Sequence, residues 1–113
     1  MTCLFCQIAK KEIKSEVVAE DERMIAFKDI NPVAPVHILI VPKKHIPSAA
    51  ALERSDLPLV AEMIWFAKEL AEKLGIAQSG YKLIFNSGKD AGQMVDHLHL
   101  HLIGGKRLER WPV

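Results

Sequence analysis

The chain has no long apolar run, no excess of one charge and few cysteines, and each absence excludes a class of protein. No stretch approaches the roughly 20 apolar residues that a helix needs to cross a bilayer, and the first residues do not form a secretory leader. The 15 basic and 14 acidic residues leave a net charge of +1, without the concentrated basic face typical of DNA or RNA binding. Two cysteines are too few for a disulfide scaffold. We therefore expect a cytoplasmic protein whose partners include no membrane and no nucleic-acid polymer.

The composition is that of an ordinary globular domain. Half of the 113 residues are apolar and 26% are charged. There is no internal repeat, low-complexity stretch or break in composition that would mark a linker. We expect a single domain spanning residues 1–113.

The pattern of apolar residues predicts an α+β fold. A short helix is expected at residues 4–13, and a long one runs from a cap at Ser55 or Asp56 to Gly75, with Pro58 in its first turn. Strands are expected at residues 16–19, 24–27, 37–41, 81–86 and 95–103. The run 37–41 is apolar almost throughout, which is typical of a central strand covered on both faces. This order indicates a mostly antiparallel sheet of about five strands with one long and one short N-terminal helix.

The long helix carries an apolar stripe that we predict to face the core. Its members recur at helical spacing: Val60, Met63, Ile64, Ala67, Leu70, Ala71 and Leu74. Trp65 lies beside this stripe. Two interpretations explain its position: Trp65 belongs to a second buried surface, such as a homodimer interface, or it is an exposed aromatic residue without a role.

Three histidines alternate with leucines in the stretch His97-Leu-His99-Leu-His101-Leu-Ile. A strand sends alternate side chains to opposite faces, so the leucines are predicted to face the core and the imidazoles a polar site. His97 and His101 would stand roughly 13 Å apart on a straight strand, too far for one metal ion to bind all three. Imidazole itself is a nucleophile toward phosphorus near neutral pH, which favours chemistry on the ring.

The alternating stretch resembles the signature of the histidine triad superfamily, and the likeness covers nearly the whole chain. Further similarity lies in residues 27–37, 41–45 and 81–86 and in Gly92-Gln93. Gly104-Gly105 and Trp111-Pro112 resemble the purine-nucleotide phosphoramidase branch more than the dinucleoside-polyphosphate hydrolase branch. The resemblance implies a nucleotide hydrolase that cleaves the P–N bond of AMP-linked amines through a covalent AMP–histidine intermediate at His99. The chemistry needs no cofactor.

The same resemblance implies a set of site residues. His101 would bond the phosphoryl group, Asp29 the ribose hydroxyls, and His37 would support the triad. The remaining nucleotide-binding positions are Phe5, Ile8, Phe27, Ile30, Leu39, Asn86, Gly92, Gln93, Met94 and Val95. Met94 stands where this branch commonly carries serine, and Asp96 where tyrosine is common. We expect both departures to alter the preference for the leaving group.

Cys3 and Cys6 have the spacing of half a zinc site. Once the triad roles are assigned, His45 and His97 are the candidates for the other two ligands. The resemblance implies the same set, because several histidine triad relatives hold a structural zinc at matching positions. A pair of free thiols and a thioredoxin-like redox motif are the alternatives, although the strand expected before such a motif is absent.

Two other functions stay open beside the phosphoramidase. A nucleotide-binding regulatory or scaffold protein would bind AMP with negligible turnover, and a dinucleoside polyphosphate hydrolase would cleave a bridged substrate. The expected partners are therefore purine nucleotides (AMP and AMP–amine conjugates) and a second copy of the chain.

Overall fold

The computed structural model describes residues 3–108, so Trp111 and Pro112 lie outside the described residues. Five antiparallel strands form one sheet in the order β1-β2-β3-β5-β4. The strands are β1 (Val17–Glu20), β2 (Met24–Lys28), β3 (Val36–Pro42), β4 (Tyr81–Phe85) and β5 (Leu100–Gly104). The helices are α1 (Leu4–Ala9) and α2 (Leu57–Lys73), with 3-10 turns η1 (Ala49–Ala51), η2 (Arg54–Asp56) and η3 (Lys89–Ala91). The predicted α+β architecture is confirmed.

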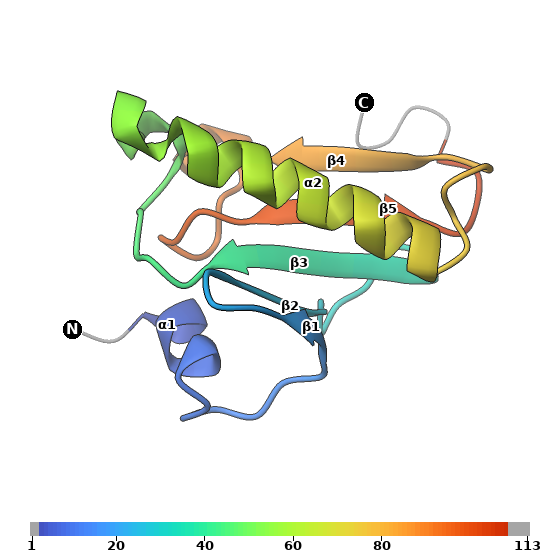
Figure 1. The fold of residues 1–113 in the computed structure, drawn as a ribbon, viewed down its shortest axis with the longest axis horizontal. Coiled ribbons are helices and arrows are strands. Elements are labelled where there is room, and N and C mark those ends of the chain that lie inside the picture. Colours follow the sequence, from blue (N-terminus) through green and yellow to red (C-terminus); the bar gives the residue numbers. More distant parts are fainter. Residues whose placement is uncertain (1–2, 109–113) are drawn as a thin grey trace.

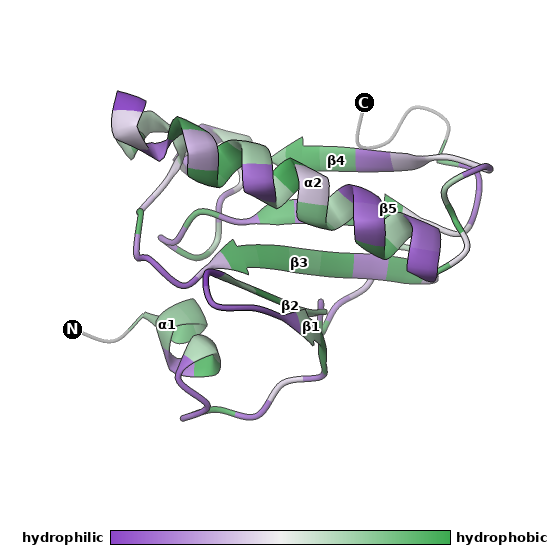
Figure 2. Cartoon of the chain, viewed as in Figure 1, coloured by the Kyte–Doolittle hydropathy of each residue, from purple (hydrophilic) through white to green (hydrophobic). Residues whose placement is uncertain are grey.

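The two faces of the sheet have different covers (Figure 1). On one face Ile38 and Ile40 of the central strand β3 pack into the larger core cluster beneath α2. On the other, Leu39 and Val41 join a smaller cluster with Phe5 of α1. This double cover explains why β3 is almost continuously hydrophobic along its length (Figure 2).

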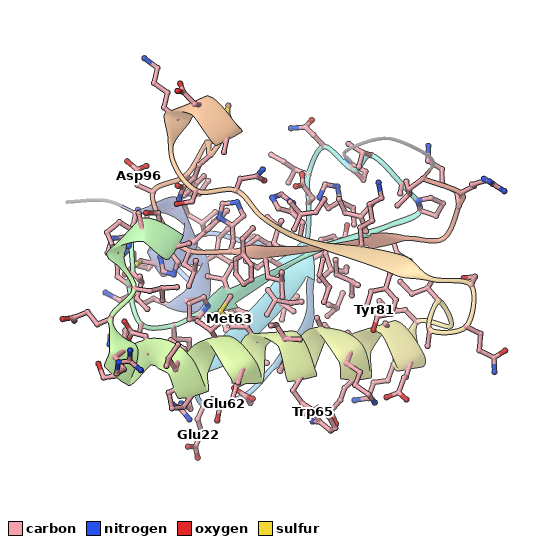
Figure 3. All side chains as sticks on the ribbon, turned by 90° about the horizontal axis from the view of Figure 1, so that it is seen from above. Glu22, Glu62, Met63, Trp65, Tyr81 and Asp96 are labelled. Atoms are coloured by element: carbon pink, nitrogen blue, oxygen red, sulfur yellow. The ribbon has the colours of Figure 1, made fainter. Side chains whose placement is uncertain are left out.

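The core-facing stripe of α2 differs in part from the predicted one. Met63 is fully buried and points toward the sheet, whereas Trp65 points away from it (Figure 3). Ile64 and Leu74, which we predicted to be core, are 45% and 40% exposed, and Leu59 is buried in their place. Helical spacing identified the apolar side of α2 but not its centre, because the sheet sets the angle at which α2 lies. No helix within residues 3–108 is long and apolar enough to span a bilayer.

Two predicted element boundaries are wrong by four residues or more. The first helix ends at Ala9 rather than at residue 13, because Lys10 caps it and Lys11 adopts a left-handed conformation with φ 65°. The last strand begins at Leu100 rather than at residue 95. The end of β4 sets this start, because Phe85 is the last residue of β4 and lies directly opposite Leu100, whereas β3 continues two residues beyond its own pairing with Leu100.

Candidate active site

A cavity of about 480 Å³ opens on the sheet face that is not covered by α2. Most of the predicted nucleotide-binding and catalytic positions line it: Phe5, Ile8, Phe27, Asp29, Ile30, Leu39, Asn86, Gly92, Met94, Val95, His99 and His101. The sequence analysis did not identify Lys14 or Ser15, which also line it. These two residues lie in the segment between α1 and β1, and they carry no motif that would have identified them.

The inner wall of the cavity is apolar and aromatic. Phe5 meets Phe27 edge to face with ring centroids 5.5 Å apart, and it meets the His99 imidazole in the same way at 5.1 Å. At the rim, by contrast, Ile30 and Met94 are 89% and 92% exposed. A flat apolar ring bound in the cavity would therefore pack against aromatic side chains inside and contact two exposed apolar side chains at the entrance.

The predicted alternation of histidines and leucines is confirmed, although β5 covers only part of that stretch. Leu98, Leu100 and Leu102 belong to the core cluster beneath α2. His99 and His101 line the cavity on the opposite face, with ring centroids 5.0 Å apart. His97 is fully buried and lies outside the cavity lining.

The backbone determines which nitrogen of His99 carries the proton. Its Nδ1 lies 2.7 Å from the carbonyl oxygen of His97, and the ring is buried. A carbonyl oxygen only accepts hydrogen bonds, so we assign the proton to Nδ1. Nε2 then holds a free lone pair on a ring that lines the cavity, which is the form that a nucleophile requires.

A hydrogen-bonded chain assigns the His37 and His101 tautomers. The backbone N–H of Val33 donates to His37 Nδ1 at 3.2 Å, so the His37 proton lies on Nε2. That Nε2 is 3.0 Å from His101 Nδ1 and 3.4 Å from an Asp29 carboxylate oxygen. His101 accepts at Nδ1 and therefore carries its own proton on Nε2, free to donate to a ligand. His37, predicted to support the triad, is the middle member of this chain.

Burial keeps both of these imidazoles neutral. It lowers the pKa of His101 to about 4, with smaller contributions from the neighbouring His99 and His37 rings. The pKa of His37 is also lowered by burial, and the Asp29 carboxylate opposes this shift. At neutral pH His101 is therefore a donor of one hydrogen bond rather than a cation.

The loop around η3 is braced by amide side chains. Gln93 accepts from the Gly88 N–H at 2.8 Å and donates to the carbonyls of Pro47 and Val95 at 2.7 and 3.0 Å. All of its polar atoms are used in this way, so its side chain holds the loop rather than the cavity. Asn86 braces the same loop through the Ala91 carbonyl at 3.0 Å. Asp96 is exposed and does not line the cavity (Figure 3).

The four predicted metal ligands lie together beside α1. Their donor atoms, from Cys3, Cys6, His45 and His97, all lie within 4.8 Å of one another. His97 Nδ1 is 3.3 Å from Cys3 Sγ, 3.5 Å from Cys6 Sγ and 3.1 Å from His45 Nδ1, and Cys6 Sγ is 3.4 Å from His45 Nδ1. A tetrahedral zinc ion keeps nitrogen and sulfur ligands about 3.3–3.8 Å apart, so this spacing suits zinc.

The tautomer of His97 also suits a metal ligand. Its Nε2 lies 2.8 Å from the Pro42 carbonyl, so Nε2 carries the proton and the lone pair of Nδ1 faces the two sulfur atoms. Burial, together with the neighbouring Cys3, raises the pKa of the Cys6 thiol, with Lys10 opposing the shift. A bound cation reverses that effect, because a coordinating thiol loses its proton.

Comparison with known proteins gives matches along nearly the whole chain. The HIT domain family matches residues 10–108, which contain all five strands and the histidines of the cavity. Protein HitA of Neisseria gonorrhoeae is 45% identical over 102 residues, or 90% of this chain and 94% of HitA. The purine nucleoside phosphoramidase of Escherichia coli (strain K12) is 42% identical over 105 residues, or 93% and 88% of the two chains. The crystal structure of a HIT family hydrolase from Legionella pneumophila Philadelphia 1 superposes with a TM-score of 0.97 at 46% identity and covers 99% of this chain and 100% of that one.

Proposed function

The chain belongs to the HIT domain family. On this basis we propose that it hydrolyses the P–N bond of purine nucleoside 5′-phosphoramidates, and that its substrates are AMP-linked amines. One observation carries the proposal: the His97 carbonyl holds the proton on Nδ1 of His99, which leaves a lone pair on a ring that lines the cavity. The 42% identity to the phosphoramidase of E. coli supports the same class of reaction.

In the first step, His99 Nε2 attacks the α-phosphorus. The new P–N bond to the imidazole forms as the P–N bond to the amine breaks, and the departing nitrogen takes up one proton from solvent to leave as the amine. The imidazole becomes cationic, and its Nδ1–H continues to donate to the His97 carbonyl, which stabilises that charge. His101 Nε2–H donates to a phosphoryl oxygen, where negative charge develops.

In the second step, water attacks the same phosphorus. The P–O bond forms, the P–Nε2 bond breaks, and the water molecule releases one proton to solvent. AMP leaves and His99 regains its lone pair, so the sum of both steps is the substrate plus water giving AMP and the free amine. In this proposal Asp29 accepts hydrogen bonds from the ribose hydroxyls, and Phe5 and Phe27 pack against the purine.

Steady-state hydrolysis of two substrate classes tests the proposal. We expect turnover of an AMP-linked amine, measured by release of the amine, and a kcat/KM at least about tenfold lower for a diadenosine polyphosphate. The reverse ranking would favour a dinucleoside polyphosphate hydrolase. Absence of turnover on both substrates, together with AMP binding by calorimetry, would favour a nucleotide-binding regulatory or scaffold protein.

The rim residue Met94 is expected to influence which amines are preferred. Its thioether is 92% exposed on the cavity rim and offers an apolar contact but no hydroxyl. We expect Met94→Ser to raise kcat/KM for an AMP conjugate of a polar amine relative to that of an apolar amine by about three- to tenfold. An unchanged ranking of the two conjugates would contradict this role.

We also propose that Cys3, Cys6, His45 and His97 hold a structural zinc ion. Zinc supplies no step of the reaction; it would fix α1 and the loop after β3 against the segment that carries His97. Protein purified from the cytoplasm, where we expect it to reside with reduced thiols, should contain about one equivalent of zinc by elemental analysis. We expect Cys6→Ser to lower the zinc content several-fold, and a wild type with less than about a tenth of an equivalent would refute the site.

The edge of the sheet supports a homodimer. Among the described residues β4 has no neighbour on its outer side, and Leu83 of β4 is 36% exposed. Leu83 lies opposite Leu102, so its side chain stands on the α2 face, where Leu57 and Ile64 of α2 are also exposed. Light scattering should give the mass of two chains for the wild type and of one chain for Leu83→Lys; a monomeric wild type would contradict the dimer.

A further inference from the structure

The nucleophile lies just outside the sheet. β5 begins at Leu100, so residues 95–99 are not positioned by strand pairing. Their backbone is held instead by a tight turn from the His97 N–H to the Val95 carbonyl at 2.8 Å and by the Leu98 N–H, which donates to the Ile46 carbonyl at 2.6 Å. The position of the His97 carbonyl, and therefore of His99, depends on what anchors this short segment.

His97 is anchored through its side chain. The residue is fully buried, its Nε2–H donates to the Pro42 carbonyl, and its Nδ1 faces Cys3, Cys6 and His45. The carbonyl oxygen of the same residue accepts from His99 Nδ1 at 2.7 Å. One residue thus joins the thiol–imidazole cluster to the proposed nucleophile.

We propose that the cluster of Cys3, Cys6, His45 and His97, when it holds its metal ion, positions His99 for attack through the His97 carbonyl. His97 is then a positioning residue, and the metal site is part of how the reaction is controlled. This inference rests on the proposed role of His99 as the nucleophile.

The cluster has to act indirectly, because none of its four residues lines the cavity. Its members come from three separate parts of the chain: the start of α1, the loop after β3, and the segment before β5. Besides the His97–Pro42 and Leu98–Ile46 hydrogen bonds, these parts meet at the cluster through thiol and imidazole contacts of 3.1–3.5 Å, which are weak hydrogen bonds. Four metal–ligand bonds would replace these contacts and fix the His97 ring.

The Phe5 ring offers a second route from the cluster to His99, beside the route through the His97 carbonyl. Phe5 lies in α1 between the two cysteines, and its ring is 5.1 Å from the His99 ring and 6.1 Å from the His97 ring. Loss of a cysteine could therefore shift His99 through Phe5. His45 lies outside α1, so His45→Ala removes one metal ligand without altering this helix. Gln7→Ala is the matched control, because Gln7 lies in α1 and contributes no donor atom to the cluster.

The experiment follows the imidazole nitrogens of His99 by ¹⁵N NMR in zinc-loaded and chelator-treated wild type, in His45→Ala, in Cys6→Ser and in Gln7→Ala. We expect the loaded wild type and Gln7→Ala to keep the His99 proton on Nδ1, and zinc-free samples to show mixed tautomers. Hydrolysis of an AMP-linked amine should lose about ten- to a hundredfold in kcat in the two ligand variants, as expected for a displaced catalytic group. The Kd of AMP should change by less than about threefold, since the cavity lining is intact.

Zinc-free protein that keeps both the His99 Nδ1–H signal and the kcat of the wild type would overturn the proposal. A wild type that holds no zinc and shows the same His99 signals would do so as well. Loss of the signal in Cys6→Ser but not in His45→Ala would assign the effect to Phe5 and would also overturn the proposal.

If a ligand variant does not fold, removal of zinc from the wild type by a chelator and its re-addition give the same test. If the wild type does not hydrolyse the substrate, the proposed function fails, whereas the NMR comparison still decides whether the cluster positions His99.

Discussion

Replacement of His99 by alanine is expected to lower kcat for an AMP-linked amine by at least about a hundredfold, equivalent to about 2.7 kcal/mol of activation free energy. The variant lacks the Nε2 lone pair that forms the intermediate, and His101, the other imidazole that lines the cavity, presents a protonated Nε2. Nε2 of His101 and Nε2 of His37 are protonated in the assigned tautomers, and Nδ1 of His97 faces the cysteine cluster. Steady-state release of the amine measures this effect.

Two further measurements separate loss of the nucleophile from loss of the fold. AMP should bind His99→Ala with a Kd within about fivefold of the wild-type value, because the apolar wall and Asp29 are unchanged. Acid quench of a reaction with AMP-labelled substrate should trap a labelled adduct on the wild type and none on the variant. Equal turnover by the two proteins would refute His99 as the nucleophile.

Replacement of Met63 by alanine is expected to lower the free energy of unfolding by about 2–4 kcal/mol. Met63 is completely buried where α2 meets the sheet, beneath the leucine face of β5 (Figure 3). The truncation removes apolar burial and leaves a cavity between two rigid elements that cannot close around it. Urea unfolding followed by circular dichroism measures the loss.

Trp65→Ala provides the matched control two positions along the same helix. Its side chain is larger than that of methionine but 59% exposed, and its described partner is the Lys68 ammonium at 4.9 Å from the ring centroid. We expect this variant to lose less than about 1 kcal/mol. A greater loss for Trp65→Ala than for Met63→Ala would mean that the buried side of α2 has been wrongly assigned.

Local sequence patterns predicted the directions of side chains more accurately than the ends of elements. The alternation in residues 97–103 assigned the leucines to the core and placed His99 and His101 on the cavity face, because side-chain direction along an extended chain depends only on parity. The apolar run at residues 37–41 likewise identified the central strand. The start of β5 could not be predicted in this way, because it lies opposite Phe85, the last residue of β4, and that pairing exists only in the folded sheet.

The sequence by itself determined the family and the α+β element order and indicated the residue types of the candidate site, since all three are carried by local patterns and by a motif. Only the tertiary structure decided which nitrogen carries the proton in His37, His97, His99 and His101. The partners that assign the tautomers are backbone groups of Val33, Pro42 and His97. Every residue carries a backbone C=O and every residue except proline an N–H, so these groups leave no signal in the sequence. Their influence depends on where the fold brings them in space. For the same reason, only the fold places the Nδ1 atom of His97 beside the cysteines and its carbonyl oxygen beside His99.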